Sequence, residues 1–493
     1  MPPTLLGHPA GLATIFFLEM WERMSFYGMR ALLLLYLVHR VAEGGLGFDV
    51  GTAAAIYGLY VGGTYIACLP GGWLGDRLLG SQRAVLLGGF IITCGHVLLG
   101  LAPSSAVFFL GLLLIVLGTG LLKPNASVLV AGLYPQGGAA LDAGFTIYYV
   151  GVNVGATIGP LITSFLGERY GWSYGFMAAA FGMAIGLLQF LWSRRFLGGV
   201  GRAPTVSGSE TAGVATARRA LWGLCASALA LGGAVALAWS GRMHYSAQAL
   251  LSVSTYAIIA IAVLYFAYLL FGAGLDAVER RRIGVVILLF VASILFWAGF
   301  EQGGSSFNLF AERDTLRTVR GFTVPAGWFQ ALDPIFIVLF GPLFSVLWVQ
   351  LARRKLNPSI PLKFIFALLG MGLAFIVMAA AARRVAAGEL AGMEWLTLTY
   401  LLLTWAELAL SPVGQSAVSK LVPRRFVGQS FGVWFASIAL GELIAGRIAG
   451  HFDPTNAASL PALFMRVVWL AVICAVALAA FRPLMRRWMA GVQ

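Results

Sequence analysis

Residues 18–37 read LEMWERMSFYGMRALLLLYL, an apolar stretch that is long enough to cross a bilayer and still contains ionisable side chains. Four of them fall close to one face of a helix: Glu19, Glu22, Arg23 and Arg30. A charged side chain at the bilayer centre costs about 2.5–3.5 kcal/mol on insertion scales. We therefore expect this helix face to meet a water-filled cavity or charged partners, and not lipid.

The composition of the whole chain is typical of a polytopic membrane protein. Hydrophobic residues make up 60% of its 493 residues, and only 11% are charged. Soluble domains contain about a quarter charged residues. Division into stretches of bilayer length predicts an all-α protein with about fourteen transmembrane helices.

The net charge of +14 indicates topology and not nucleic-acid binding. With the N-terminus in the cytoplasm, most loop Lys and Arg residues fall on the cytoplasmic side, including Arg77, Arg83, Arg194, Arg195 and 280–282. We expect a multi-pass protein of the plasma membrane (the inner membrane of a bacterium) with both termini cytoplasmic. Its surroundings are the lipid bilayer, and we expect no nucleic-acid partner.

One polar segment divides the chain. Residues 197–216 read LGGVGRAPTVSGSETAGVAT and predict a flexible linker. Two apolar spans without mid-membrane charge follow, near 220–240 and 247–271, and then a basic joint at 276–282. The predicted parts are an N-terminal six-helix bundle (1–196), a linker with an inserted transmembrane helix pair (197–282) and a C-terminal six-helix bundle (283–493).

The two bundles resemble each other weakly. GLLKPNAS (120–127) in one and LALSPVGQS (408–416) in the other each combine a proline with polar residues. Matching proline-interrupted helices in two halves indicate a transporter with a site near the bilayer midplane. We expect helix breaks at Pro124 and Pro412, with functional roles for the neighbouring Lys123 and Glu407.

The charges inside the predicted spans differ in sign between the halves. The N-terminal half carries the cations Arg23, Arg30 and Lys123, beside Glu19 and Glu22, and the C-terminal half carries Glu301, Asp333 and Glu407. A cavity between such halves suits a zwitterion. Its carboxyl groups could also carry protons, because a nearby cation changes the proton affinity of a carboxylate. Position alone leaves structural and functional roles equally open for the first-helix charges, and a local structural pair is expected for Glu442 and Arg447.

Five stretches carry a resemblance to a known family. GGWLGDRLLGSQR (71–83) resembles the signature loop of the major facilitator superfamily. The other four resemble motifs of its proton-dependent oligopeptide transporter (POT) family, bacterial type: LEMWERMSFYG (18–28), FTIYYVGVNVG (145–155), FEQGGSS (300–306) and ELALSP (407–412). The resemblance implies the major facilitator fold, two six-helix bundles plus an inserted pair. It also implies a proton-coupled symporter that imports di- and tripeptides by alternating access, with protons as the coupling ion, no cofactor, no metal and no catalytic residues.

The resemblance also implies roles for individual residues. Proton coupling is expected of Glu19, Glu22, Arg23 and Glu301. The peptide carboxylate is expected at Tyr27, Arg30 and Lys123, the amino group at Asn153 and Glu407, and side chains at Tyr65, Trp297 and Trp434, with Ser411 in the Glu407 motif also in the site. Arg30–Glu301 and Lys123–Glu407 are expected to be salt bridges that break and reform as access alternates.

The chain departs from the family pattern at Met24, Phe26 and Asp333. QALDP (330–334) has Asp where the family typically has Asn, which adds a potential negative charge near the amino-group subsite. Two alternatives stay open: a proton-coupled carrier of another small solute, such as nitrate, an organic solute or a drug, and a peptide receptor that does not transport.

Overall fold

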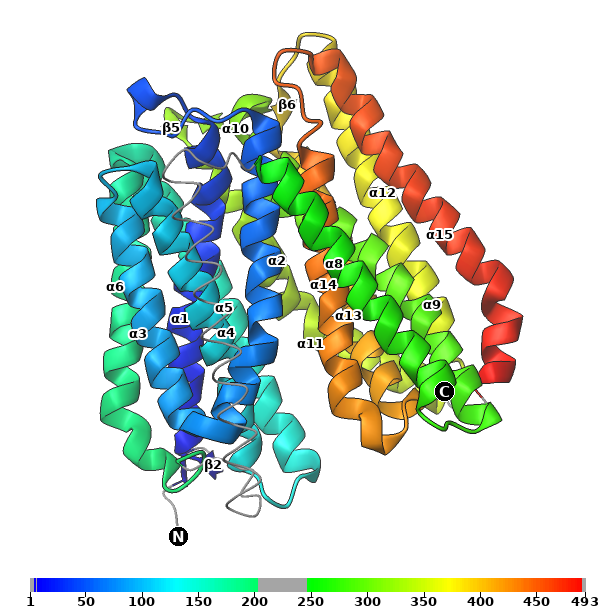
Figure 1. The fold of residues 1–493 in the computed structure, drawn as a ribbon. Helices are drawn as coiled ribbons and strands as arrows, with labels where there is room; N and C mark the ends of the chain where they lie inside the picture. Colours follow the sequence, from blue (N-terminus) through cyan, green and yellow to red (C-terminus); the bar gives the residue numbers. More distant parts are fainter. Residues whose placement is uncertain (1–3, 6, 203–245, 490–493) are drawn as a thin grey trace.

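The structure is a computed structural model that describes residues 4–5, 7–202 and 246–489 (Figure 1). Within this part, twelve helices are long and apolar enough to cross a membrane. Helix α1 (Gly11–Val38) is not among these twelve. With 28 residues it is also long enough to cross a membrane, but it contains the four charged residues. The predicted span at 220–240 and most of the predicted linker lie outside the described residues.

The N-terminal half consists of six long helices. They are α1, α2 (Val50–Leu74), α3 (Ser81–Leu101), α4 (Ser105–Gly132), α5 (Gly138–Tyr170) and α6 (Trp172–Ser193), with short turns at η1 (Val41–Glu43), η2 (Gly75–Leu79) and η3 (Arg194–Leu197) and a small antiparallel pair, β1 (Thr4–Leu5) and β2 (His8–Pro9). Polar caps set helix starts: the Asp49 side chain accepts a hydrogen bond from the Thr52 amide at α2. Glycines bring helices into backbone contact, since a Cβ at Gly155 would lie 2.1 Å from the carbonyl oxygen of Met20.

The C-terminal half follows the same plan after helix α8 (Ala247–Ala267). Its helices are α9 (Ala277–Phe300), α10 (Ser306–Arg313), α11 (Leu332–Arg353), α12 (Ile360–Ala386), α13 (Met393–Leu421), α14 (Val427–Ala449) and α15 (Leu460–Trp488), with turns at η4 (Tyr268–Gly272), η5 (Glu301–Gly304), η6 (Ala326–Ala331), η7 (Arg424–Phe426) and η8 (Ala457–Ser459). Strands β3 (Thr315–Leu316) and β6 (Ala391–Gly392) pair in parallel, and β4 (Thr318–Val319) and β5 (Phe322–Thr323) pair antiparallel.

Three local predictions are wrong. Helices α4 and α13 continue through Pro124 and Pro412, because membrane helices can accommodate an interior proline without breaking. One of the fourteen expected spans covers about 284–311, and it is not one continuous α-helix. It is interrupted at η5, where Gly303 and Gly304 follow Glu301. Residues 277–282 are not a joint: they form the first turns of α9, which the capping box of Asp276 and Glu279 starts.

The two halves lie side by side and touch along α2 and α14 (Figure 1). A Cβ at Gly446 of α14 would lie 2.6 Å from the carbonyl oxygen of Ala54 and 3.3 Å from Gly58 of α2. Such close backbone contact leaves no room for water. Charged residues inside both halves, among them Arg30, Lys123, Glu301 and Glu407, line a cavity between the halves.

Candidate functional site

A cavity of about 340 Å³ lies between the two halves. Twelve of the fourteen predicted site residues line it: Glu19, Arg23, Tyr27, Arg30, Tyr65, Lys123, Asn153, Trp297, Glu301, Asp333, Glu407 and Ser411. They come from α1, α2, α4 and α5 on one side and from α9, η5, α11 and α13 on the other. The fold therefore brings together, around one cavity, residues that the sequence analysis selected and that lie up to several hundred positions apart in the chain.

The exceptions are Glu22 and Trp434. Glu22 lies behind the cavity wall, bonded to Arg23. Trp434 does not line the cavity, so its predicted contact with peptide side chains is not supported by its position. The ring of Trp434 packs edge-to-face on Phe364, with 6.4 Å between ring centroids, and covers Gly414, where a Cβ would lie only 2.4 Å away.

The charges of α1 form a buried cluster at one side of the cavity. The Arg23 Nε donates to Glu22 and lies 3.3 Å from the Glu19 carboxylate, and the three side chains are at most 3% exposed. One guanidinium thus serves two carboxyl groups. In the described part of the chain, one oxygen of each carboxyl group has no hydrogen-bond partner. This cluster therefore contains more carboxyl groups than guanidinium groups.

Arg30 joins the two halves. Its guanidinium donates to Glu301 of η5 and to the hydroxyl of Tyr57 of α2, so the predicted Arg30–Glu301 pair is formed in this conformation. Glu442 of α14 is also near, with its Oε1 4.0 Å from the same Arg30 nitrogen. The expected Glu442–Arg447 pair is wrong: five residues rotate a helix by about 140°, and Arg447 donates instead to Ser252 at 2.6 Å.

Lys123 and Glu407 face the same cavity but are not paired. No ion pair joins them in the described part of the chain. The Lys123 ammonium lies 4.4 Å from the centroid of the Tyr65 ring, and Glu407 Oε2 has no hydrogen-bond partner among the described residues. This side of the cavity therefore offers a free cation and a free carboxyl group to a ligand.

Asp333 and Asn153 complete the polar wall. Asp333 Oδ1 accepts a hydrogen bond from Thr404 at 2.6 Å. The Asn153 amide donates to the carbonyl of Tyr149, 2.9 Å away, in its own helix. Asp333 and Glu407 line one cavity with Glu301, so three carboxyl groups of the C-terminal half face the cations of the other half.

The sequence reasoning missed further lining residues. Tyr148, Tyr149, Gln330 and Tyr400 also line the cavity. The Tyr148 hydroxyl lies near Glu19 and Ser127. Tyr148 belongs to the same motif, FTIYYVGVNVG, as the predicted site residue Asn153. That shared motif was a signal from which its place in the site could have been predicted.

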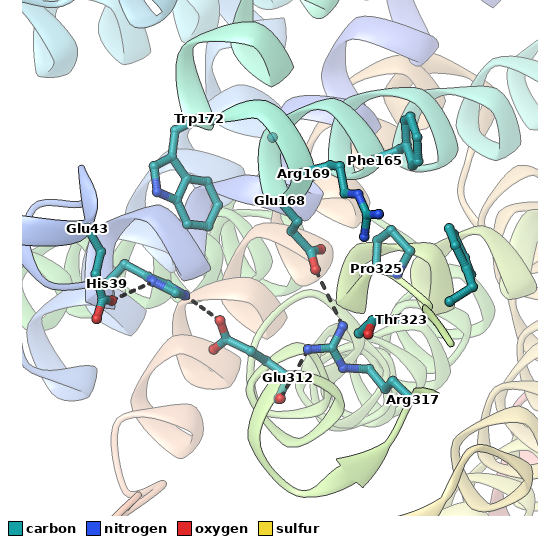
Figure 2. Close-up of a pocket in the computed structure, with 13 residues that line it drawn as sticks. His39, Glu43, Phe165, Glu168, Arg169, Trp172, Glu312, Arg317, Thr323 and Pro325 are labelled. Carbon is teal, nitrogen blue, oxygen red and sulfur yellow. Dashed lines mark hydrogen bonds and ion pairs between the residues drawn. The ribbon is translucent and has the colours of Figure 1, made fainter. Parts of the chain in front are cut away.

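A second cavity, of about 440 Å³, lies at the end of the molecule where α1 finishes (Figure 2). His39 sits between Glu43, 3.2 Å away, and Glu312 of α10, to which it is hydrogen-bonded. The hydrogen bond to Glu312 is the largest of the effects that raise the pKa of His39 above its ordinary value. We call this part of the molecule, with His39 and Glu312, the His39 end.

Further bonds join the halves at the His39 end. Glu168 of α5 accepts from the amides of Ala326 and Gly327, at 3.0 and 3.3 Å, and pairs with Arg317 at 3.4 Å. The indole of Trp328 donates to the carbonyl of Leu161 at 2.9 Å. These contacts, with Arg30–Glu301, join the two halves on this side of the central cavity.

Comparison with known proteins decides the family. A family model described as the POT family matches residues 82–466. The chain belongs to the POT family. It is 39% identical to the peptide transporter YePEPT of Yersinia enterocolitica, with 99% of this chain and 97% of the relative covered. It is 34% identical to a di-/tripeptide transporter of Lactococcus lactis subsp. cremoris, over 91% of this chain and 90% of that one.

A solved structure of a POT-family peptide transporter in complex with sulfate superimposes with a TM-score of 0.92. The two chains are 37% identical, and the match covers 99% of this chain and 98% of the other. These findings confirm the family resemblance and the all-α major facilitator fold. The protein is a multi-pass membrane transporter and not an enzyme, as members of the POT family are.

Proposed function

We propose that this transporter imports di- and tripeptides together with protons, by alternating access between its two halves. The observation that carries the proposal is the cavity itself, which has cations on the wall of the N-terminal half and carboxyl groups on the other wall. A short peptide is a zwitterion, because its amino group is positively charged and its carboxylate, several covalent bonds away, is negatively charged. Family membership and the peptide transporters among its relatives support the same substrate.

The peptide carboxylate would bind at Lys123, Arg30 and Tyr27. The amino group would bind at Glu407 and Asn153. Asp333 adds a carboxyl group beside Glu407 and would strengthen the hold on the ammonium when it is ionised. The aromatic rings of Tyr65 and Trp297, with Ser411, would border the side-chain space, which suits broad specificity because the charged ends fix the pose.

The proton would bind within the cluster of Glu19, Glu22 and Arg23 and at Glu301. Glu19 and Glu22 share one cation, Arg23, within α1. Glu301 is paired with Arg30 of the other half, so separating the halves changes the surroundings of Glu301. Moving one charge across the membrane is worth about 2.3 kcal/mol per 100 mV, which can drive peptide accumulation.

The proposed orientation places both termini in the cytoplasm of a bacterial cell, with the His39 end outside. Basic loop residues support this choice. With that orientation, the bonds at the His39 end close the cavity to the outside, and the unpaired Lys123 and Glu407 leave it open toward the cytoplasm. The described conformation would then be the one that releases peptide inside.

Uptake into proteoliposomes tests the proposal. Labelled dialanine should accumulate under an inward proton gradient and an inside-negative potential, and unlabelled peptides should compete. Glu22→Gln should abolish gradient-driven accumulation while peptide counterflow survives, because the substitution removes a proton site but not the cavity. The matched control is Glu389→Gln, which removes a carboxylate from an exposed arginine pair (Arg384–Glu389, 2.8 Å) and should behave as wild type.

Other outcomes decide against the proposal. Peptide binding without uptake would support a receptor. Gradient-driven uptake of nitrate or a drug that peptides do not inhibit would support another substrate.

A further inference from the structure

Glu442 is a buried carboxyl group that has no role in the family motifs or in the proposed transport cycle. It lies on α14 with 0% of its surface exposed. Its backbone is pressed against α2, where a Cβ at Gly58 would lie 2.9 Å from the Glu442 carbonyl oxygen. It does not line the central cavity, whereas Arg30 and Glu301 do.

Within residues 4–5, 7–202 and 246–489, the surroundings of Glu442 contain a single cation. The charged and titratable groups that face it in the described part of the chain are Arg30 of α1, Tyr57 and Tyr65 of α2, and Glu301 of η5. No donor group of the described residues reaches either Glu442 oxygen, and the hydrogen-bonding neighbour of its side chain is another carboxyl group, that of Glu301. The nearest Arg30 nitrogen is 4.0 Å away, about 1 Å longer than a hydrogen-bonded ion pair.

Charge counting favours a cluster that holds a proton. With both carboxyl groups ionised, Arg30, Glu301 and Glu442 would carry a net charge of −1, with Glu442 fully buried. An ionised carboxylate without donors is penalised by several kcal/mol when it is buried. Because Arg30 already bonds to Glu301, the proton belongs on Glu442, and the cluster is then neutral.

We propose that Glu442 is a second proton-holding carboxyl group of the transporter and alternates with Glu301 as the partner of Arg30. When the proton moves from the Glu442 carboxyl to Glu301, the O–H bond of Glu442 breaks and that of Glu301 forms. The guanidinium then turns from Glu301 to Glu442. Arg30 keeps an anionic partner in both arrangements, so the proton can reach the cavity-lining carboxyl group without leaving a buried guanidinium unpaired.

This inference rests on the proposed proton-coupled transport, and its test has one arm that needs no transport. Infrared spectra of the purified full-length protein in lipid should show the C=O band of protonated buried carboxyl groups. The part of the band that comes from Glu442 should disappear in Glu442→Gln. It should persist in the control Glu389→Gln, whose carboxylate is exposed and ion-paired.

The second arm measures the pH dependence of proton-driven peptide uptake. In Glu442→Gln, protonating Glu301 leaves Arg30 without an anion, so half-maximal uptake should require about a tenfold higher proton concentration, a shift of about one pH unit. Glu442→Asp keeps the carboxyl group and should keep both the band and a profile near that of wild type. Counterflow reports whether each variant is folded.

The outcomes separate the two proposals. Wild-type protein without proton-driven uptake would refute the proposed function, whereas the infrared arm would still test Glu442. An unchanged band and an unchanged pH profile in Glu442→Gln would overturn this inference and leave Glu442 a structural group. If the glutamine variant does not fold, the band of a folded Glu442→Asp protein is compared with that of wild type: a change in its position assigns it to residue 442, and an identical band would overturn the inference.

Discussion

The two inter-half charge pairs of the cavity have the same chemistry and different states. At Arg30 the cation and the carboxylate are joined, both are nearly buried, and further bonds at the His39 end close the structure around them. At Lys123 the cation lies over a tyrosine ring, and Glu407 has an unused oxygen. A transporter that alternates access needs such an asymmetry, because its site must not be open to both sides of the membrane at once.

The difference teaches how a charged residue in a membrane helix is accommodated. Arg30 is held by partners in both halves, so it stabilises one conformation of the protein. Lys123 is held by an aromatic face and is available to a ligand. Under the proposed function, one basic residue stabilises a conformation and the other binds the substrate.

The largest expected effect is that of Arg30→Ala. It leaves Glu301 and Glu442 buried without a cation, and removing one partner of a buried ion pair destabilises a protein by about 3–5 kcal/mol. We expect both peptide uptake and thermal stability to fall, measured in proteoliposomes and by thermal unfolding in detergent. A variant as stable as wild type would show that this pair does not hold the conformation.

A smaller effect is expected at the open pair. Lys123→Gln or Glu407→Gln removes from the protein a charged group that would hydrogen-bond to the ligand. Each substitution should weaken peptide binding about 10- to 100-fold without lowering stability. The matched control is Lys363→Gln, since Lys363 lies over the Trp348 ring at the same 4.4 Å but does not line the cavity. Equal losses in the control and in Lys123→Gln would remove the distinction between the two pairs.

The smallest effect concerns pH at the His39 end. Because Glu312 and Glu43 raise the pKa of His39 above its ordinary 6.5, the bridge between the halves is complete below about pH 6.5 and is lost as pH rises through the raised pKa. Raising the pH should therefore favour opening of this end by no more than about fivefold, the scale of a partly exposed ion pair. His39→Gln should remove this dependence.

Spin labels can measure that opening. The exposed positions Val41 and Leu316, changed to Cys in a background without the native cysteines, lie on opposite halves at the His39 end. Their distance distribution should gain a longer component at high pH in the wild-type background and not in His39→Gln. An identical pH response in both proteins would assign the switch to other groups.

Much of the site could be predicted from the sequence because charge in a membrane segment is informative by itself. Glu19, Arg30, Lys123 and Glu407 could be singled out without any knowledge of the fold, since lipid does not tolerate them. Trp434 was expected in the site through the family resemblance and not through charge, and it shows a limit of prediction from sequence. Tryptophan is tolerated in a core as well as in a cavity, so nothing in its neighbourhood along the chain distinguishes the two.

The sequence by itself determined the class of the protein, the membrane-spanning pattern and the opposite charges of the two halves, because hydropathy and charge act locally along each helix. Only the tertiary structure decided which partners these charges have. Glu442 lies five residues from Arg447 but contacts Arg30, over four hundred positions away, because helix rotation and the backbone contact of α2 with α14 set its neighbours. Pairing across the halves is a property of packing, and packing depends on residues from the whole chain.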